Sequence, residues 1–184
     1  MIPLLIVLAV FILFTVFLYN SLVVKRNIVK NSFASVDTLL KKRYDLIPNL
    51  VNTVKTYMQH ENKTLTKITE LRSQAVKTDN PEKTMDIEKK MDGLLKSLMV
   101  QVENYPTLKA NQNFLRLQTT LNTIEGQISA ARRAYNAAVT DFNNSIRVFP
   151  NNIIAGMFNF REKKLFEITE EERKNVDVGK IFNE

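Results

Sequence analysis

The stretch FLRLQTTLNTIEGQISAARRAYNAAVTDF, residues 114–142, carries the strongest periodic signal in the chain. Its apolar residues recur at alternating steps of three and four, and this spacing is typical of one face of a helix. A sustained repeat of 3.5 residues produces a seam that packs against neighbouring helices, as in coiled coils and antiparallel bundles. The stretch therefore predicts a helix of about 35 residues, or about 50 Å, within an elongated bundle. The predicted seam consists of Phe114, Leu117, Leu121, Ile124, Ile128, Ala131, Tyr135, Ala138 and Phe142.

Two shorter apolar stripes between residues 25 and 78 predict two further helices of the bundle. Lys41, Lys42 and Arg43 would place positive charge at the carboxyl end of the first helix, where it interacts favourably with the helix dipole. Asp45 can cap the second helix, whose first turn tolerates Pro48. A single kinked helix through this region is the alternative. The stripes consist of Val29, Phe33, Val36 and Leu40, and of Leu50, Val54, Tyr57, Leu65, Ile68, Leu71 and Ala75.

A third helix is expected to begin at Pro81, directly after Asn80. This pair is typical of a helix start, because Asn accepts hydrogen bonds from free N–H groups and Pro fits the first turn. The short connections favour an up-and-down order of helices. After the long helix, Phe149 and Pro150 predict a stop, and Asn151–Met157 is expected to form a short helix. The stripe of the third helix consists of Ile87, Met91, Leu94, Leu98 and Val102.

The beginning of the chain predicts a transmembrane helix. Residues from Ile2 to Leu18 include no charged side chain, and the apolar character continues to Val24. As a helix, residues 2–24 would be about 34 Å long, enough to cross a hydrocarbon core of about 30 Å. A cleaved signal peptide is the alternative, but no Lys or Arg precedes the apolar run and no Ala-x-Ala site lies near Asn20. We therefore expect an uncleaved anchor, with Tyr19 at the membrane interface.

Three basic residues follow this apolar segment directly, namely Lys25, Arg26 and Lys30. Because positive flanks stay in the cytoplasm, they predict a single-pass protein with its N-terminus outside and its bundle in the cytoplasm. The same three side chains are candidate contacts for anionic lipid headgroups, each worth about 1 kcal/mol when well placed. Nucleic acid is the other partner that a net charge of +7 could attract. No recognition motif accompanies the charge, so we expect no specific nucleic-acid partner.

The composition supports an all-α fold and excludes several kinds of chemistry. The 184 residues are 45% hydrophobic and 24% charged, with only four Gly and five Pro, too few for a sheet with many tight turns. Without Cys there is no disulfide, thiolate zinc site, iron–sulfur ligation or cysteine nucleophile. A single His also argues against most zinc and triad chemistry. We therefore expect no enzyme, with no catalytic, cofactor-binding or metal-binding residues and no cofactor.

A few polar residues invite sharper interpretations. His60 and Glu61 resemble the start of a zinc-protease motif, but that motif needs a second His where this chain has Thr64. Carboxylate pairs without a pocket signal are better explained as caps and helix-surface charges. The pairs concerned are Asp37 with Asp45 and Glu61 with Glu70.

Arg132 and Arg133 could bind phosphate, but solvated or ion-paired arginines are the simpler interpretation. The acidic run at residues 170–172, followed by Arg173 and Lys174, predicts a solvated helix end or tail. The domain organisation expected from these signals is a transmembrane anchor at residues 1–24, a helical bundle at 25–148, and a short helix with a C-terminal tail at 149–184.

Several strings along the chain match a known family in order and spacing. They are YNSLV at 19–23, RN at 26–27, RYDLIPNLV at 43–51, HE at 60–61, ENYPTLKAN at 103–111, NF at 113–114, ARRAYN at 131–136, FN at 142–143 and FP at 149–150. These strings resemble the LemA family of bacterial membrane proteins, and the resemblance covers about nine tenths of the chain. The chain departs from the family near its end, where the family often has Pro before a Val-x-Phe close and this chain has Asp177, Val178 and Phe182.

The resemblance implies a single N-terminal membrane helix, an antiparallel bundle of four long helices and no established enzymatic activity, in the inner or plasma membrane of a bacterium. Some relatives are linked to membrane remodelling in magnetosome-forming bacteria, and others are encoded beside a membrane heat-shock metalloprotease. We therefore expect a non-enzymatic scaffold or interaction module in membrane organisation. The expected partners are membrane lipids and either another protein or further copies of the chain, and any small-molecule ligand stays open. A regulatory partner of a membrane metalloprotease is the alternative.

Overall fold

The computed structural model describes residues 2–58 and 62–166. Within these ranges the chain forms helices and connections, without a strand. The helices are α1 (Ile2–Tyr57), α2 (Asn62–Val76), α3 (Pro81–Val102), α4 (Pro106–Lys109), α5 (Gln112–Arg147) and α6 (Asn151–Met157).

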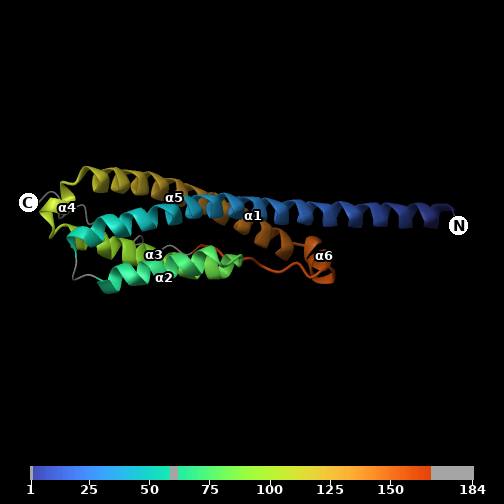
Figure 1. The fold of residues 1–184 in the computed structure, drawn as a ribbon. Helices are drawn as coiled ribbons and strands as arrows, with labels where there is room; N and C mark the ends of the chain where they lie inside the picture. Colours follow the sequence, from blue (N-terminus) through green and yellow to red (C-terminus); the bar gives the residue numbers. More distant parts are fainter. Residues whose placement is uncertain (1, 59–61, 167–184) are drawn as a thin grey trace, which may run out of the picture.

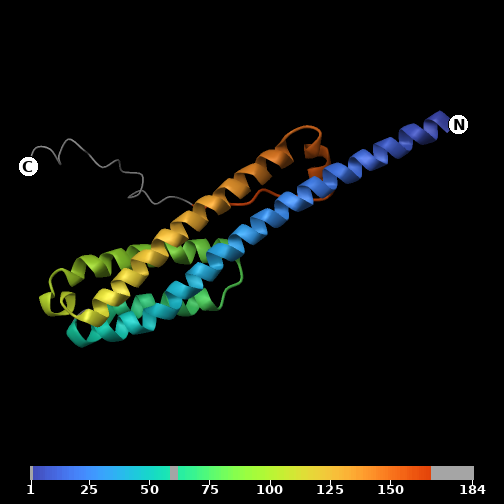
Figure 2. The same cartoon turned by 90° about the horizontal axis from the view of Figure 1, so that it is seen from above.

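The four long helices alternate in direction and form an elongated antiparallel bundle (Figures 1 and 2). The most extensive packing joins α1 to α5, while α2 packs on both α1 and α3. The four-residue α4 forms the turn at the end of the bundle that lies away from the N-terminus. At the opposite end, α6 packs against α1 and α5 where α1 leaves the bundle (Figure 1). The all-α class and the bundle architecture predicted from the sequence are confirmed.

Helix α1 runs without interruption through the region where the sequence predicted a helix end. Arg43 and Asp45 both lie inside it, so the predicted end at Lys41–Arg43 and the Asp45 cap are wrong. The alternative of one helix through Pro48 holds. Helix α1 ends instead at Tyr57 and α2 begins at Asn62, so the predicted second helix is divided between α1 and α2.

The register of buried residues explains why α1 continues. Its buried positions keep alternating steps of four and three across the basic cluster, and a helix that ended there would lose half of its seam. These positions are Val36, Leu40, Arg43, Ile47, Leu50 and Val54. The apolar seam thus outweighs the local charge signal.

A hydrogen bond from α2 compensates for Pro48 in the middle of α1. Pro48 has no N–H to donate, so the carbonyl of Tyr44, four residues earlier, lacks its partner within the helix. The Nε atom of Arg72 on α2 donates to this carbonyl at 2.9 Å. The proline therefore frees an acceptor that ties α2 to α1.

We expect Arg72→Ala to lower the free energy of unfolding by about 1–2 kcal/mol, because it leaves the Tyr44 carbonyl partly buried without a donor. In a Pro48→Ala background the new N–H can reach this carbonyl, and the same substitution should cost less. Thermal unfolding of the full-length protein in detergent, followed by circular dichroism, measures this coupling. Lys67→Ala on the exposed face of α2 is the control. Equal costs in both backgrounds would show that Arg72 acts through packing alone.

The helix starts expected from Asn80 and Pro81 are confirmed. The Oδ1 atom of Asn80 accepts hydrogen bonds from the N–H groups of Glu82 at 2.9 Å and Lys83 at 3.3 Å. Asn111 caps α5 in the same way, through the N–H groups of residues 113 and 114. These caps satisfy N–H groups that would otherwise lack partners at the first turn.

Helix α5 follows the predicted seam closely. Six of the predicted positions are buried, whereas Leu117, Ala131 and Ala138 are only partly buried, and Val139 and Ile146 join the core. The buried positions from the prediction are Phe114, Leu121, Ile124, Ile128, Tyr135 and Phe142. The predicted short helix at Asn151–Met157 is confirmed as α6.

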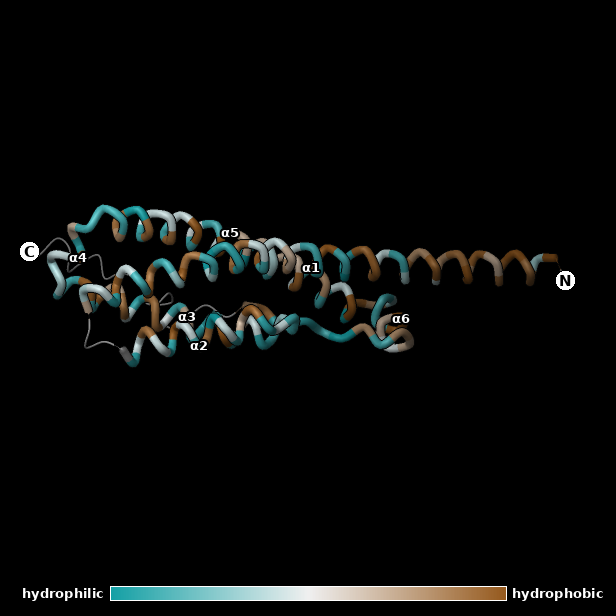
Figure 3. Tube along the Cα trace, viewed as in Figure 1, coloured by the Kyte–Doolittle hydropathy of each residue, from teal (hydrophilic) through white to brown (hydrophobic). Residues whose placement is uncertain are grey.

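The N-terminal part of α1 projects beyond the bundle with an apolar surface (Figures 1 and 3). Its large apolar side chains from Ile2 to Phe17 are 48–74% exposed. Among the described helices, α1 alone has the length and composition to cross a membrane. Further along the same helix, Leu22 is fully buried in the core of the bundle. A cleavage near Asn20 would therefore cut α1 directly before a turn that is packed in this core. These features support a membrane anchor over a signal peptide.

Residues 158–166 return along the bundle as an extended strap. Asn143 and Asn136 on α5 each pair with the strap backbone, through Lys163 and Phe166 respectively, at 2.8–3.0 Å. The Phe166 ring is buried against Phe33 and Tyr135. This part of the expected C-terminal tail is therefore docked on the bundle. The acidic run at 170–172 and residues 177, 178 and 182 lie outside the described residues.

Candidate functional site

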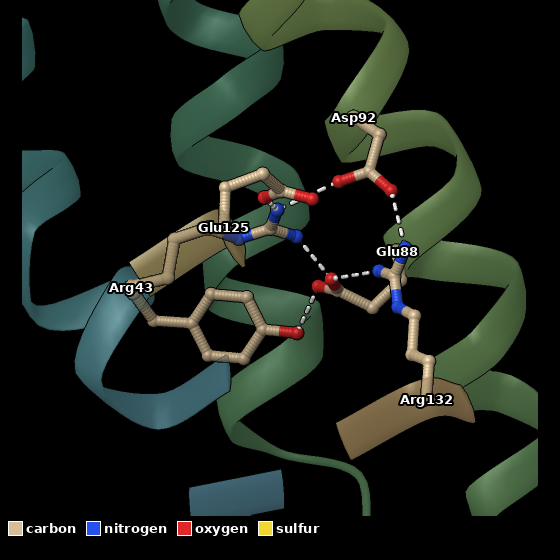
Figure 4. A network of polar contacts seen from close by, with 6 residues as sticks. Arg43, Glu88, Asp92, Glu125 and Arg132 are labelled. Atoms are coloured by element: carbon tan, nitrogen blue, oxygen red, sulfur yellow. Dashed lines mark hydrogen bonds and ion pairs between the residues drawn. The ribbon is translucent and has the colours of Figure 1, made fainter. Parts of the chain in front are cut away.

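A network of charged side chains lies inside the bundle, where α1, α3 and α5 face one another (Figure 4). Arg43 from α1 and Glu88 from α3 are each 1% exposed, and Asp92, one turn further along α3, is 8% exposed. From α5 come Glu125 and Arg132, both partly buried. The site thus holds three carboxylates and two guanidinium groups.

Arg43 binds all three carboxylates. Its Nη1 atom lies 2.7 Å from Asp92 Oδ1 and 2.7 Å from Glu125 Oε2, and its Nη2 atom pairs with Glu88 Oε2. The hydroxyl of the neighbouring Tyr44 donates to the other Glu88 oxygen. One turn of α1 therefore holds α3 and α5 together.

Arg132 closes the network from α5. Its Nη1 atom lies 3.0 Å from Asp92 Oδ2, and its Nη2 atom lies 3.1 Å from Glu88 Oε2. Its guanidinium carbon also lies 5.3 Å from the centroid of the Phe166 ring in the strap. Arg43 and Arg132 thus pair with the same two carboxylates on α3, and the Phe166 ring of the strap lies against Arg132.

The surroundings fix the protonation of the two α1 residues. Burial by itself lowers the pKa of Arg43, but Glu88, Asp92 and Glu125 outweigh it and raise the pKa above its usual value. Burial, and then the negative charge of Glu88, raise the pKa of Tyr44. Arg43 therefore stays charged and Tyr44 stays a neutral hydrogen-bond donor.

Most of this network was not predicted from the sequence. Arg43 was expected to interact with the dipole at the carboxyl end of a helix, and this prediction is wrong because Arg43 lies inside α1. Glu88, Asp92 and Glu125 were not predicted as site residues. The ion-paired interpretation of Arg132 is confirmed, and Arg133 donates to Ser129 on the surface of α5. The sequence signal that could have revealed the network was the presence of charged residues at seam positions of the helices.

On α1, Arg43 stands between Leu40 and Ile47 at the spacing of a core residue, and on α3 Glu88 stands between Thr84 and Met91 in the same way. A charged residue at a seam position must find partners inside the bundle, because an isolated buried charge is too costly.

A groove of about 710 Å³ lies beside the network, between α3 and α5. Arg43, Asp92 and Glu125 of the network line this groove, together with further polar residues such as Asn122 and apolar side chains such as Met99 and Leu121. The ion pairs occupy the carboxylates, and within residues 2–58 and 62–166 no cluster of His, Cys, Asp or Glu is arranged to hold a metal ion. The arrangement can cross-link helices and offer a groove, and it presents no activated nucleophile.

The three candidate membrane contacts lie at the end of the bundle from which α1 projects. Lys25 pairs with Asp141 of α5 at 2.5 Å, and the Arg26 guanidinium lies 5.1 Å from the Phe160 ring centroid. Lys30 is exposed beside the strap residue Lys163, in a second groove.

The remaining candidates are dispersed. Lys41 and Lys42 point to solvent, and Asp37, Asp45 and Glu70 are surface residues. His60 and Glu61 lie outside the described residues.

Comparison with known proteins agrees with this architecture. The LemA family profile matches residues 32–179. Protein LemA of Metamycoplasma hominis is 31% identical over 166 residues, which are 89% of this chain and 75% of that protein. Magnetosome proteins MamQ 1 and MamQ 2 of Paramagnetospirillum magneticum are each 33% identical over 70 residues, 38% of this chain and 26% of theirs. Because the family match spans most of the chain, this protein belongs to the LemA family.

Proposed function

We propose that the protein is a non-enzymatic, membrane-anchored scaffold that presents its bundle to protein partners at the cytoplasmic face of the inner or plasma membrane. The observation that carries the proposal is the continuity of α1, which extends from the apolar segment into the core and ends only at Tyr57. Because no linker intervenes, the anchor holds the bundle directly beside the membrane. A module held in this way presents a defined surface.

Confinement to a membrane raises the local concentration of such modules, so weak lateral contacts become effective. The groove between α3 and α5 offers one surface for such contacts. The relatives named as magnetosome proteins support a role in membrane organisation.

Crosslinking and affinity capture of the full-length protein in native membranes test this function. We expect crosslinked copies of the chain or a reproducible set of bound proteins. A membrane metalloprotease recovered in a fixed ratio would instead support the regulatory alternative. Recovery of the uncrosslinked monomer alone would contradict a scaffold.

We expect a cysteine at position 41 to resist an impermeant thiol reagent in intact cells. Lys41 is exposed and the chain has no native Cys, so Lys41→Cys reports only on the bundle. The positive flank of the anchor predicts a cytoplasmic location. A cysteine added ahead of Met1 should react in intact cells, and Lys41→Cys should react once the cells are permeabilised. Labelling of Lys41→Cys before permeabilisation would place the bundle outside.

The membrane-proximal bases, Lys25, Arg26 and Lys30, are proposed to contact anionic headgroups. We expect residues 21–184, which lack the anchor, to bind anionic liposomes weakly, and replacement of all three bases by Gln to remove most of that binding. Lys41 lies about 25 Å beyond Val24, the end of the apolar segment. At physiological salt, its attraction to the headgroups is screened over this distance. The matched control therefore replaces Lys41 and Lys42 by Gln. Flotation at low and physiological salt measures binding, and loss in the control alone would contradict the assignment.

A further inference from the structure

The short helix α6 and its flanks expose an apolar patch that residues 2–58 and 62–166 leave uncovered. The α6 patch is defined as Val148, Phe149, Ile153, Met157 and Phe158, whose side chains are 51–75% exposed. Ile153 and Met157 are four residues apart and share one face of the helix. Ile154 and Ala155, between them, are buried against the bundle. Helix α6 therefore has apolar residues on an outward face as well as on its packed face.

The α6 patch lies at the end of the bundle where α1 leaves it (Figures 1 and 2). The ring of Tyr19 on α1 lies 4.7 Å from that of Phe158 and 5.9 Å from that of Phe160, measured between centroids. Leu22, one turn further along α1, is fully buried. These contacts place α6 at the level of residues 19–22 of α1.

This level coincides with the inner boundary of the expected membrane span. A transmembrane helix needs about 20 apolar residues, and the apolar segment begins at Ile2. Its inner end therefore falls near Tyr19–Leu22, just before the first charged residue, Lys25. A side chain exposed at this level meets the boundary between acyl chains and headgroups, where burial of apolar groups is favourable.

We propose that the α6 patch inserts into the interfacial region of the bilayer that α1 spans, as an apolar membrane contact in addition to the anchor. The inference rests on the proposed membrane anchoring and deepens it by assigning a lipid-binding surface. Residues 148–160 contain no charged side chain. Of the two bases that flank them, Arg147 pairs with Glu162 at 2.7 Å, whereas Arg161 donates to Asn159. An uncharged apolar segment with a basic flank suits acyl chains next to headgroups. Continuity with the spanning helix favours lipid over a protein as the occupant.

Two contacts constrain the bundle more than one. A single helix permits rotation about its own axis and a range of tilts. With α6 also inserted, the side of the bundle on which α6 packs is held at the membrane interface. The orientation of the α3–α5 groove relative to the bilayer is then fixed.

The chain contains no Trp, so a single introduced Trp reports on one position. We would reconstitute the full-length variants Phe149→Trp and Met157→Trp into vesicles of phosphatidylglycerol and phosphatidylcholine, the latter brominated on its acyl chains. Phe11→Trp in the expected span and Val100→Trp on exposed α3 are the references. We expect loss of emission for the two α6 variants and Phe11→Trp, and unchanged emission for Val100→Trp. The α6 variants should be quenched most by bromine near the headgroup end of the chain.

A further pair of variants tests the patch itself. Ile153→Asp in the Met157→Trp background should reduce quenching, whereas Asn152→Asp, which adds the same charge at an exposed position outside the patch, should not. If the α6 variants resemble Val100→Trp while Phe11→Trp is quenched, the proposal is overturned and the anchor stands. Blue-shifted but unquenched emission means that protein covers the patch and also overturns it. An unquenched Phe11→Trp contradicts membrane anchoring, and the inference falls with it.

Discussion

Arg43→Ala is expected to lower the free energy of unfolding by about 3–5 kcal/mol, the typical cost of removing one partner from a buried ion network. The substitution leaves Glu88 and Asp92 buried with Arg132 as their remaining cationic partner in the network. It also leaves a cavity where the guanidinium group was. Chemical denaturation of the full-length protein in detergent, followed by circular dichroism, measures the loss.

Two control variants separate charge from packing. Lys42→Ala removes an exposed cation from the adjacent position and should change stability by less than about 0.5 kcal/mol. The double variant Arg43→Met, Glu88→Met removes both partners, and Arg132 and Asp92 keep their pair. It should be more stable than Arg43→Ala, because unpaired buried charge costs more than apolar replacement. A cost for Arg43→Ala no larger than for Lys42→Ala would show that the network contributes nothing to stability.

The network also accounts for how α3 keeps its place in the bundle. Helix α3 packs on α2, while a groove separates much of it from α5. Arg43 and Arg132 reach across from α1 and α5 to the same two carboxylates on α3. A one-turn slip of α3 would separate these charges, so the network selects a single register as well as holding the helices together.

Those parts of the bundle could be predicted from the sequence in which a single local pattern indicated the helix and no other pattern contradicted it. The α5 seam and the start of α3 at Asn80 and Pro81 each depend on residues close in sequence, and both predictions are confirmed. The predicted break near Arg43 is wrong because local charge and Pro48 suggested a helix end, while the buried register continued. Between the end of α1 at Tyr57 and the start of α2 at Asn62, the sequence contains neither Gly nor Pro, the residues that usually mark a turn.

The ion network could be predicted only in part. Spacing shows that Arg43 and Glu88 occupy seam positions, so a need for buried partners is readable from the sequence. Which groups pair depends on how α1, α3 and α5 align along the bundle axis, and that alignment depends on the connections between them. Because the end of the first helix was predicted at Lys41–Arg43 and not at Tyr57, the position of Arg43 along the bundle axis relative to α3 could not be derived.

The second large effect is expected from Ile128→Asp, which places a carboxylate in the centre of the α5 seam. Ile128 is fully buried, and an unpaired charge there should cost roughly 3–5 kcal/mol, enough to abolish much of the helicity of a marginally stable bundle. Gln127→Asp introduces the same group at the adjacent exposed position and should be nearly neutral.

The pH dependence provides an independent check of where the new carboxylate lies. Burial raises the pKa of an unpaired Asp above its unfolded value, so the folded state holds the proton to higher pH than the unfolded state does. The cost of Ile128→Asp should therefore grow as pH rises above about 4, where the unfolded Asp ionises, and level off above the folded pKa. Thermal unfolding at about pH 4 and about pH 8, each relative to Gln127→Asp, measures this difference. Equal costs at both values would mean that residue 128 is solvated, and the α5 seam would then face away from the core.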